Sequence, residues 1–329
     1  MEYTNQNGKI VRIEGVFKML VSMKNVVKLY GNQTVLDNLN LNINEGMIFG
    51  LLGPNGAGKT TAIHILAGLI ERNSGEVSVF GMAQDTKNLK TRAQMGLVTQ
   101  EVTVFDDLSA KENLEYFGGL YGLKGKELQD NITEVLEFVG LSDKGKQKPG
   151  KFSGGMRRRL NIACAIVHKP KFLIMDEPTV AIDPQSRNHI LESVKKIAAR
   201  GTTILYTSHY MEEVQAICSH IAIMDAGRVI AQGTTDELIG QIQHEEIVRI
   251  TAVVASDILT TELKAIGGVK DVKVNGNEYA VSSTVGSGNL NRILEVAQRN
   301  GGVAGFSADK PNLEDVFLTL TGKKLRDEE

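Results

Sequence analysis

Hydrophobic and polar positions repeat with strand-like and helix-like periodicity in different parts of this chain, and together these patterns predict a mixed α/β protein. Leu39, Leu41 and Ile43 alternate with asparagines, the period-2 pattern of a half-buried strand. Continuous apolar stretches, typical of strands buried on both faces, occupy residues 47–52, 172–175 and 203–207. Residues 62–69 and 184–200 instead repeat apolar positions at helical spacing. Residues 221–232 read as a hairpin about Asp225-Ala226-Gly227. Strands that alternate with helices predict a sheet with helices packed on its faces.

The stretch from about residue 105 to residue 165 interrupts this alternation and is predicted to be a helical insert. Ser109 and Glu112 have the spacing of a capping box, and apolar residues then recur at helical spacing. A second amphipathic run covers residues 128–139 and stops at Gly140. Because no strand pattern occurs here, we expect the insert to separate two sheet-forming halves.

After residue 246 the pattern starts again as a second, smaller unit. Strands are predicted at 247–253, 269–274, 279–282 and 303–308, with helices at 258–266 and 290–298. This β-α-β-β-α-β order is that of a ferredoxin-like α+β module. Residues 313–320 read as a closing helix whose apolar side we expect to pack on the small sheet. The predicted divisions are an extension at 1–20, a first domain at 21–235, a linker at 236–246 and a C-terminal domain at 247–329.

Composition narrows the class of protein. The 329 residues include 37 basic and 39 acidic side chains, a net charge of −2, which gives no field for binding nucleic acid. The two cysteines, Cys164 and Cys218, lie in apolar helical patterns, so a disulfide framework or a zinc site is not indicated and a reducing cytosol is favoured. The apolar stretches are far shorter than the ~20 residues that a membrane span needs.

Residues 53–61, Gly-Pro-Asn-Gly-Ala-Gly-Lys-Thr-Thr, lie between a buried strand and a helix and carry the most specific motif. The spacing G-x-x-x-x-G-K-[ST] predicts a loop whose backbone N–H groups hold phosphates. Lys59 would reach the β- and γ-phosphate oxygens, and Thr60 would ligate Mg²⁺. A plain glycine-rich turn would not explain Lys59.

Asp176 and Glu177 follow the apolar strand at 172–175. Carboxylates at the end of a buried strand need partners such as a metal ion. Asp176 fits a Mg²⁺ role through water, and Glu177 fits the group that polarises an attacking water. The alternative for the isolated pair is a helix N-cap.

Residues 151–160, KFSGGMRRRL, suggest a second anion-binding helix N-terminus in a chain that already has a phosphate loop. The three arginines, Arg157 to Arg159, point in different directions on a helix, and we interpret them as a solvated face rather than a nucleic-acid patch.

The order of these motifs resembles that of the nucleotide-binding subunits of ATP-binding cassette (ABC) transporters, over about residues 20–235. The motifs are the phosphate loop, Gln100, the Ser-Gly-Gly turn, Asp176-Glu177 and His209. The resemblance implies a phosphate-loop NTPase fold with an antiparallel N-terminal β part. It also implies that Tyr30 stacks on adenine, that Gln100 touches Mg²⁺ and signals to a membrane subunit, and that His209 contacts the γ-phosphate. Alone, Tyr30 would be interpreted as an aromatic residue at a strand end, Gln100 as a polar strand terminus and His209 as a capped surface histidine.

The resemblance further implies a head-to-tail pair of copies, in which Ser153 and Gly155 of one copy hold the γ-phosphate bound to Lys59 of the other. Lys59, Glu177 and His209 are then the catalytic candidates, and Thr60, Gln100 and Asp176 the metal candidates. The ATP-binding candidates are Tyr30, Gly53, Pro54, Asn55, Gly56, Ala57, Gly58, Lys59, Thr60, Thr61, Gln100, Ser153, Gly154 and Gly155.

Three positions depart from the common family pattern. Phe152 and Met156 replace Leu and Gln around the Ser-Gly-Gly turn, and Ala181 replaces a Gly. Ala181 matters most because alanine resists positive φ.

The tail at residues 312–322 resembles the drug, antibiotic and cation exporter branch, whose ATPases are separate from their permeases. We therefore predict an ATPase that is cytoplasmic, peripheral to the membrane through a separate permease, and drives export. The alternative is a cassette ATPase that acts on nucleic acid or ribosomes. Residues 247–329 carry no phosphate-binding or acid–base motif and are predicted to be dispensable for the chemistry.

Overall fold

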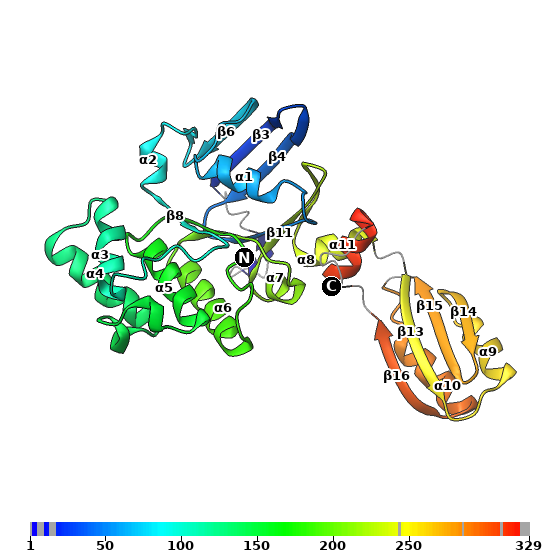
Figure 1. Ribbon diagram of the computed structural model, residues 1–329. Helices are drawn as coiled ribbons and strands as arrows, with labels where there is room; N and C mark the ends of the chain where they lie inside the picture. Colours follow the sequence, from blue (N-terminus) through cyan, green and yellow to red (C-terminus); the bar gives the residue numbers. More distant parts are fainter. Residues whose placement is uncertain are drawn as a thin grey trace. The chain divides into compact units, whose positions relative to one another are not determined.

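The structure is a computed structural model that describes residues 2–4, 10–12, 18–242, 245–284, 286–309 and 312–322. The described residues fall into two compact units, which divide at Thr235 (Figure 1). The predicted extension at 1–20 contributes a short antiparallel pair, β1 (Glu2–Thr4) and β2 (Ile10–Arg12), and the first two residues of β3. Residues 1, 5–9 and 13–17 of that extension lie outside the described part.

A six-stranded sheet forms the centre of the first unit, in the order β12-β11-β5-β10-β9-β8. Its strands are β5 (Ile48–Leu52), β8 (Met95–Val98), β9 (Phe172–Met175), β10 (Thr203–Tyr206), β11 (His220–Asp225) and β12 (Arg228–Gly233). All neighbours are parallel except the predicted β11–β12 hairpin. β5, β9 and β10 are buried along their whole length, as their continuous apolar sequence predicts. The carboxyl ends of parallel strands meet at one edge, so the loops after β5, β8, β9 and β10 converge there.

A second, antiparallel sheet with the order β4-β3-β6-β7 completes the sheet structure of this unit. It consists of β3 (Met19–Tyr30), β4 (Gln33–Asn44), β6 (Ser74–Val79) and β7 (Met82–Ala83). Leu39, Leu41 and Ile43 are buried while the intervening Asn40 and Asn42 are exposed, which confirms the period-2 prediction. Helix α1 (Lys59–Leu66) joins both sheets in one hydrophobic core.

The predicted helical insert is present as α3 (Ala110–Leu120), α4 (Gly125–Phe138) and α5 (Gly154–Ile166), which form their own lobe in Figure 1. Ser109 and Glu112 make both hydrogen bonds of the capping box. Two 3₁₀ turns, Ser142–Lys144 and Pro149–Lys151, occupy the loop before α5. The remaining helices of this unit are α2 (Leu89–Arg92), α6 (Pro184–Ala199) and α7 (Met211–Ile217).

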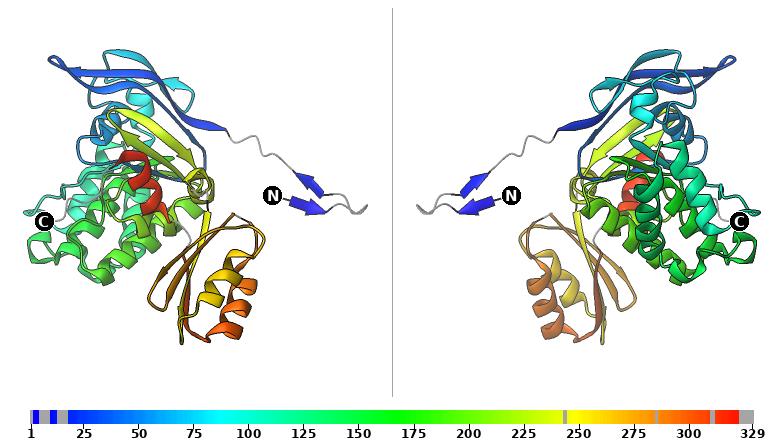
Figure 2. Two further views of the ribbon diagram at one scale, coloured as in Figure 1. Left: turned by 90° about the vertical axis from the view of Figure 1, so that its right-hand side faces the viewer. Right: turned by 90° about the vertical axis from the view of Figure 1, so that its left-hand side faces the viewer.

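The second unit contains a four-stranded antiparallel sheet with the order β14-β15-β13-β16. Its elements are β13 (Glu245–Ala252), α9 (Asp257–Lys264), β14 (Val269–Asn275), β15 (Glu278–Thr284), α10 (Leu290–Asn300) and β16 (Val303–Asp309). Helices α9 and α10 cover one face of the sheet (Figure 2). The β-α-β-β-α-β order confirms the ferredoxin-like prediction.

Two expectations about the second unit are wrong. Of the predicted linker at 236–246, most is helix α8 (Thr235–Ile242) and its last two residues begin β13; residues 243 and 244 are outside the described part. The closing helix α11 (Leu313–Thr321) packs against α8, and its buried Leu313, Val316 and Phe317 are not part of the core of the small sheet. An apolar helix stripe predicts burial but does not specify the partner, and α8 offers the buried Leu238.

Within the described ranges, no helix is long and apolar enough to cross a bilayer. Cys164 and Cys218 are buried free thiols, and burial raises the pKa of each well above the usual range.

Candidate functional site

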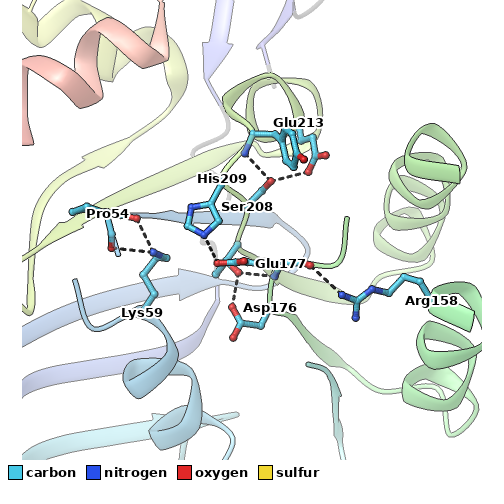
Figure 3. Close-up of polar contacts among 11 residues, drawn as sticks. Pro54, Lys59, Arg158, Asp176, Glu177, Ser208, His209 and Glu213 are labelled. Atoms are coloured by element: carbon cyan, nitrogen blue, oxygen red, sulfur yellow. Dashed lines mark hydrogen bonds and ion pairs between the residues drawn. The ribbon is translucent and has the colours of Figure 1, made fainter. Parts of the chain in front are cut away.

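The loop at residues 53–61 passes directly from β5 into α1, as the motif requires. Gly56 and Gly58 adopt φ angles of 79° and 99°, which lie in the left-handed region that favours glycine. Lys59 is 8% exposed, and its Nζ donates hydrogen bonds to the carbonyl oxygens of Gly53 (2.6 Å) and Pro54 (3.2 Å) (Figure 3). Burial lowers the pKa of Lys59, and the charges of Glu177 and Asp176 oppose that shift. A buried ammonium group therefore lies beside two carboxylates.

Asp176 is 7% exposed at the carboxyl end of β9. Its Oδ1 accepts a hydrogen bond from the Thr207 hydroxyl at 2.7 Å. Burial raises the pKa of Asp176, and the nearby Glu177 adds to this, while Thr207 and Lys59 act in the other direction. A cation beside Asp176 would favour its ionised form.

Glu177 pairs with His209, whose Nε2 lies 2.6 Å from Glu177 Oε1 (Figure 3). Burial alone would raise the pKa of Glu177, but the hydrogen bond and charge of His209 outweigh it and hold that pKa below its ordinary value. Glu177 has a φ of 49°, a conformation that costs an L-residue roughly 1–2 kcal/mol. Its backbone N–H donates to Thr207 Oγ1 at 2.9 Å, so Thr207 contacts both members of the carboxylate pair.

Glu213, in the first turn of α7, is a site-supporting residue that the sequence analysis missed. It is 3% exposed, and its Oε2 accepts hydrogen bonds from the hydroxyls of Thr179 (2.7 Å), Tyr206 (2.8 Å) and Ser208 (2.8 Å). Thr179 follows Glu177 and Ser208 precedes His209, so one carboxylate ties together the two loops that supply the Glu177–His209 pair. Its place four residues before the buried Ile217 was the available signal.

Ser153 and the two glycines after it begin helix α5, as predicted. Ser153 is the N-cap, and its Oγ accepts a hydrogen bond from the N–H of Met156 at 3.3 Å. Ser153 and Gly154 are exposed, whereas a side chain at Gly155 would overlap Ser186 of α6. The glycine at 155 is therefore required for close helix packing, and Ser153 and Gly154 remain accessible to a ligand.

The three consecutive arginines of α5 have different environments, and the predicted solvated face is wrong for one of them. Arg157 is partly exposed and pairs with Asp106. Arg159 donates to the carbonyl oxygens of Val139 (2.8 Å) and Gly140 (3.3 Å).

Arg158 is the exception, with 2% of its surface exposed. It lies four residues before Ile162 and seven before Ala165 on the buried side of α5, a spacing that could have revealed it.

Gln100 and Tyr30 are both accessible. Gln100 is exposed in the loop after β8, next to the edge at which Asp176 and Glu177 lie. Tyr30 is 50% exposed at the end of β3, with Lys28 Nζ 5.0 Å from its ring centroid. An exposed aromatic face is available for stacking, but no described contact links Tyr30 to Lys59.

Ala181 adopts the conformation that glycine would favour. Its φ is 58°, in the loop between Glu177 and the Asp183 cap of α6. Alanine at this position therefore takes the left-handed conformation that glycine favours, and it is a second strained residue near Glu177.

Known proteins resemble this chain in both sequence and fold. The sequence profile described as ABC transporter matches residues 36–180. The linearmycin resistance ATP-binding protein LnrL of Bacillus subtilis is 40% identical over 311 residues, 94% of this chain and 100% of that protein. The Nod factor export ATP-binding protein I of Cupriavidus metallidurans is 37% identical, covering 94% of this chain and 99% of the relative.

This chain belongs to the ABC transporter ATP-binding proteins. A solved ATP-binding subunit of an ABC transporter superposes with a TM-score of 0.63 and 29% identity, over 68% of this chain and 92% of that one. A dimeric ATP-binding cassette in a post-hydrolysis state, bound to ADP and Pi, superposes with a TM-score of 0.60 and 28% identity, over 65% and 98%. The first unit is thus an ABC ATPase cassette, an ATP-binding and ATP-hydrolysing fold, and the family resemblance drawn from the motifs is confirmed.

Proposed function

We propose that two copies of this cassette close head to tail around two ATP molecules, so that each site combines residues from both chains. Lys59 and the 53–61 loop of one copy hold the phosphates, and Ser153 and Gly155 of the other copy, with the accessible Gly154 between them, face the γ-phosphate. Supporting this, α5 presents an accessible, serine-capped N-terminus, and such a terminus attracts anions. A solved relative of the same family is a dimer.

In this proposal Glu177 orients and polarises the attacking water, while His209 holds Glu177 and contacts the γ-phosphate. The pairing with His209 keeps the pKa of Glu177 low and the carboxylate ionised at neutral pH. Tyr30 stacks on adenine.

Mg²⁺ fits the oxygen donors of Thr60, Gln100 and Asp176, and when bound it would neutralise charge on the phosphates. Thr207 donates a hydrogen bond to Oδ1 of Asp176, and the remaining lone pairs of this carboxylate would be available to the ion or its water.

We further propose that ATP turnover drives a separate membrane permease, and that the chain works at the cytoplasmic face of the membrane through that permease. The names of the relatives support export as the direction, because they include linearmycin resistance, daunorubicin resistance and Nod factor export proteins. They do not support the alternative of a nucleic-acid or ribosome ATPase.

A complementation experiment tests the shared site. Ser153→Arg should retain ATP binding, since its own phosphates lie on Lys59, yet lose turnover. Lys59→Ala should lose ATP affinity with the fold intact. Mixed together, the two inactive variants form one site with both defects and one with neither, so part of the activity should return. Loss of ATP binding in the Ser153 variant alone would place Ser153 in its own copy's pocket and contradict the head-to-tail arrangement.

A further inference from the structure

Arg158 is the largest fully buried side chain in the part of the chain that the structure describes. A guanidinium carries five N–H donors and a permanent charge, so its burial is unfavourable unless acceptors surround it. Burial lowers the pKa of Arg158 from its usual value. Such a charge is compensated only where the geometry of its hydrogen bonds is good.

Three backbone carbonyl groups accept hydrogen bonds from Arg158. Nη1 donates to the oxygen of Thr99 at 2.6 Å, and Nη2 donates to the oxygens of Gln100 (2.6 Å) and Glu177 (3.2 Å). Thr99 and Gln100 follow β8, and Glu177 follows the neighbouring strand β9. The guanidinium therefore connects α5 to the ends of two parallel strands, and Figure 3 shows its contact with Glu177.

The contact with Glu177 restrains its main chain. Glu177 has a left-handed φ, a conformation that persists only where the surroundings impose it. Thr207 binds its N–H and Arg158 binds its carbonyl oxygen. The direction of the Glu177 side chain thus depends on the position of α5.

Arg158 lies five residues after Ser153 on the same helix. A helix moves as a rigid element over this distance, so a displacement of its N-terminus is carried to Arg158.

We propose that Arg158 is a positioning residue that links the two ATP sites of the dimer. ATP held by the partner contacts Ser153 of this chain, and Arg158 transfers the resulting shift of α5 to Glu177 and Gln100 of this chain's own site. This rests on the head-to-tail arrangement proposed above. A purely structural Arg158 would stabilise the fold without making one site respond to the other.

The test is steady-state ATPase activity of the full-length chain as a function of ATP concentration, for wild type, Arg158→Lys and Arg158→Gln. Lysine keeps the charge but lacks the planar fork that reaches three carbonyls. Both variants should keep ATP affinity within about 3-fold, lose about 10-fold or more in turnover, and give a Hill coefficient of one where wild type exceeds one. Arg157→Lys, the neighbouring substitution in an exposed ion pair, is the matched control and should behave as wild type.

Three outcomes overturn the proposal: wild-type turnover in both variants, reduced turnover with an unchanged Hill coefficient, or a wild-type Hill coefficient of one. If Arg158→Gln does not fold, Arg158→Lys decides. The Ser153→Arg variant distinguishes a failure of the head-to-tail arrangement from a failure of the role proposed for Arg158. If Ser153→Arg turns over normally, the head-to-tail site fails and this proposal with it. If Ser153→Arg is inactive while every Arg158 variant that folds is normal, only the role of Arg158 fails.

Discussion

The two units differ most in what they bury. The cassette buries charged side chains at one edge of its sheet, among them Lys59, Arg158, Asp176, Glu177 and Glu213. Among the described residues of the second unit, the buried polar side chains are Ser283 and Asn289, both uncharged. Each buried ion costs several kcal/mol unless its partners compensate. The contrast locates the chemistry in the cassette and leaves the second unit an apolar core with an unassigned surface.

Among substitutions of the buried charged residues of the cassette, the largest expected effect is on ATP turnover. Glu177→Gln removes the carboxylate proposed to polarise water while keeping its size, so turnover should fall at least ~100-fold, the scale of a lost general base. Phosphate release measures this, with Glu212→Gln, an exposed neighbour of Glu213, as the control. The variant should still bind ATP and accumulate as a dimer in light scattering. Turnover above a tenth of wild type would remove Glu177 from its proposed role.

The second prediction compares the stability lost when a buried polar side chain is removed from each unit. Glu213→Ala leaves three buried hydroxyls without their acceptor and should lower the free energy of unfolding by about 3 kcal/mol. Asn289→Ala in the second unit loses two hydrogen bonds and should cost about 1–2 kcal/mol. Urea unfolding of both, beside the exposed Glu212→Ala, checks the ranking. Equal losses for Glu213 and Asn289 would show that the contrast in buried polarity has no energetic counterpart.

Asp176→Asn should stabilise the nucleotide-free protein, in contrast to the two preceding substitutions. The fold raises the pKa of Asp176, so its ionised form is penalised and stability is lost as pH rises through that pKa. The amide keeps an oxygen for Thr207 and carries no charge, so the nucleotide-free variant should melt at a higher temperature than wild type at pH 7. The difference should disappear in acid, where Asp176 is protonated. A lower melting temperature at pH 7 would mean that the carboxylate is better compensated than its burial indicates.

The smallest effect concerns ATP binding after removal of the small sheet. Residues 245–309 lie between α8 and α11, which pack on each other, so a short Gly/Ser bridge in their place keeps that helix pair. We expect ATP affinity within about 2-fold of wild type, measured by fluorescent nucleotide titration, because the phosphate loop and its partners are elsewhere. Truncation after Gly240 also removes α11 and part of α8, and should melt earlier than the excised form.

If the protein without residues 245–309 folds but binds no ATP, the conclusion that the cassette alone carries the ATP site is contradicted. Altered dimerisation or transport with normal ATP binding would instead support a regulatory role for the small sheet.

Sequence reasoning succeeded where the information is local. Alternation at Leu39, Leu41 and Ile43, the Ser109 cap and the 53–61 loop each depend on residues within a few positions of one another. It failed for Arg158 and α11 because their partners are distant. The carbonyls that Arg158 contacts belong to Thr99 and Gln100, 59 and 58 residues away, and an apolar stripe on α11 does not reveal that α8 covers it. The pairing of Glu177 with His209 likewise could not be predicted from local sequence, because the two residues lie in separate loops that the sheet brings together.

The pairing of α8 with α11 has a consequence for cleavage of the chain. The small sheet is joined to this helix pair by two connections, before β13 and after β16, instead of one. A protease that cuts the connection between α8 and β13 leaves the sheet covalently joined to α11, and the packing of α11 on α8 then holds the two pieces of the chain together without a covalent link. Limited proteolysis should release the small sheet as a free fragment only after two cuts, whereas a domain on a single linker would separate after one.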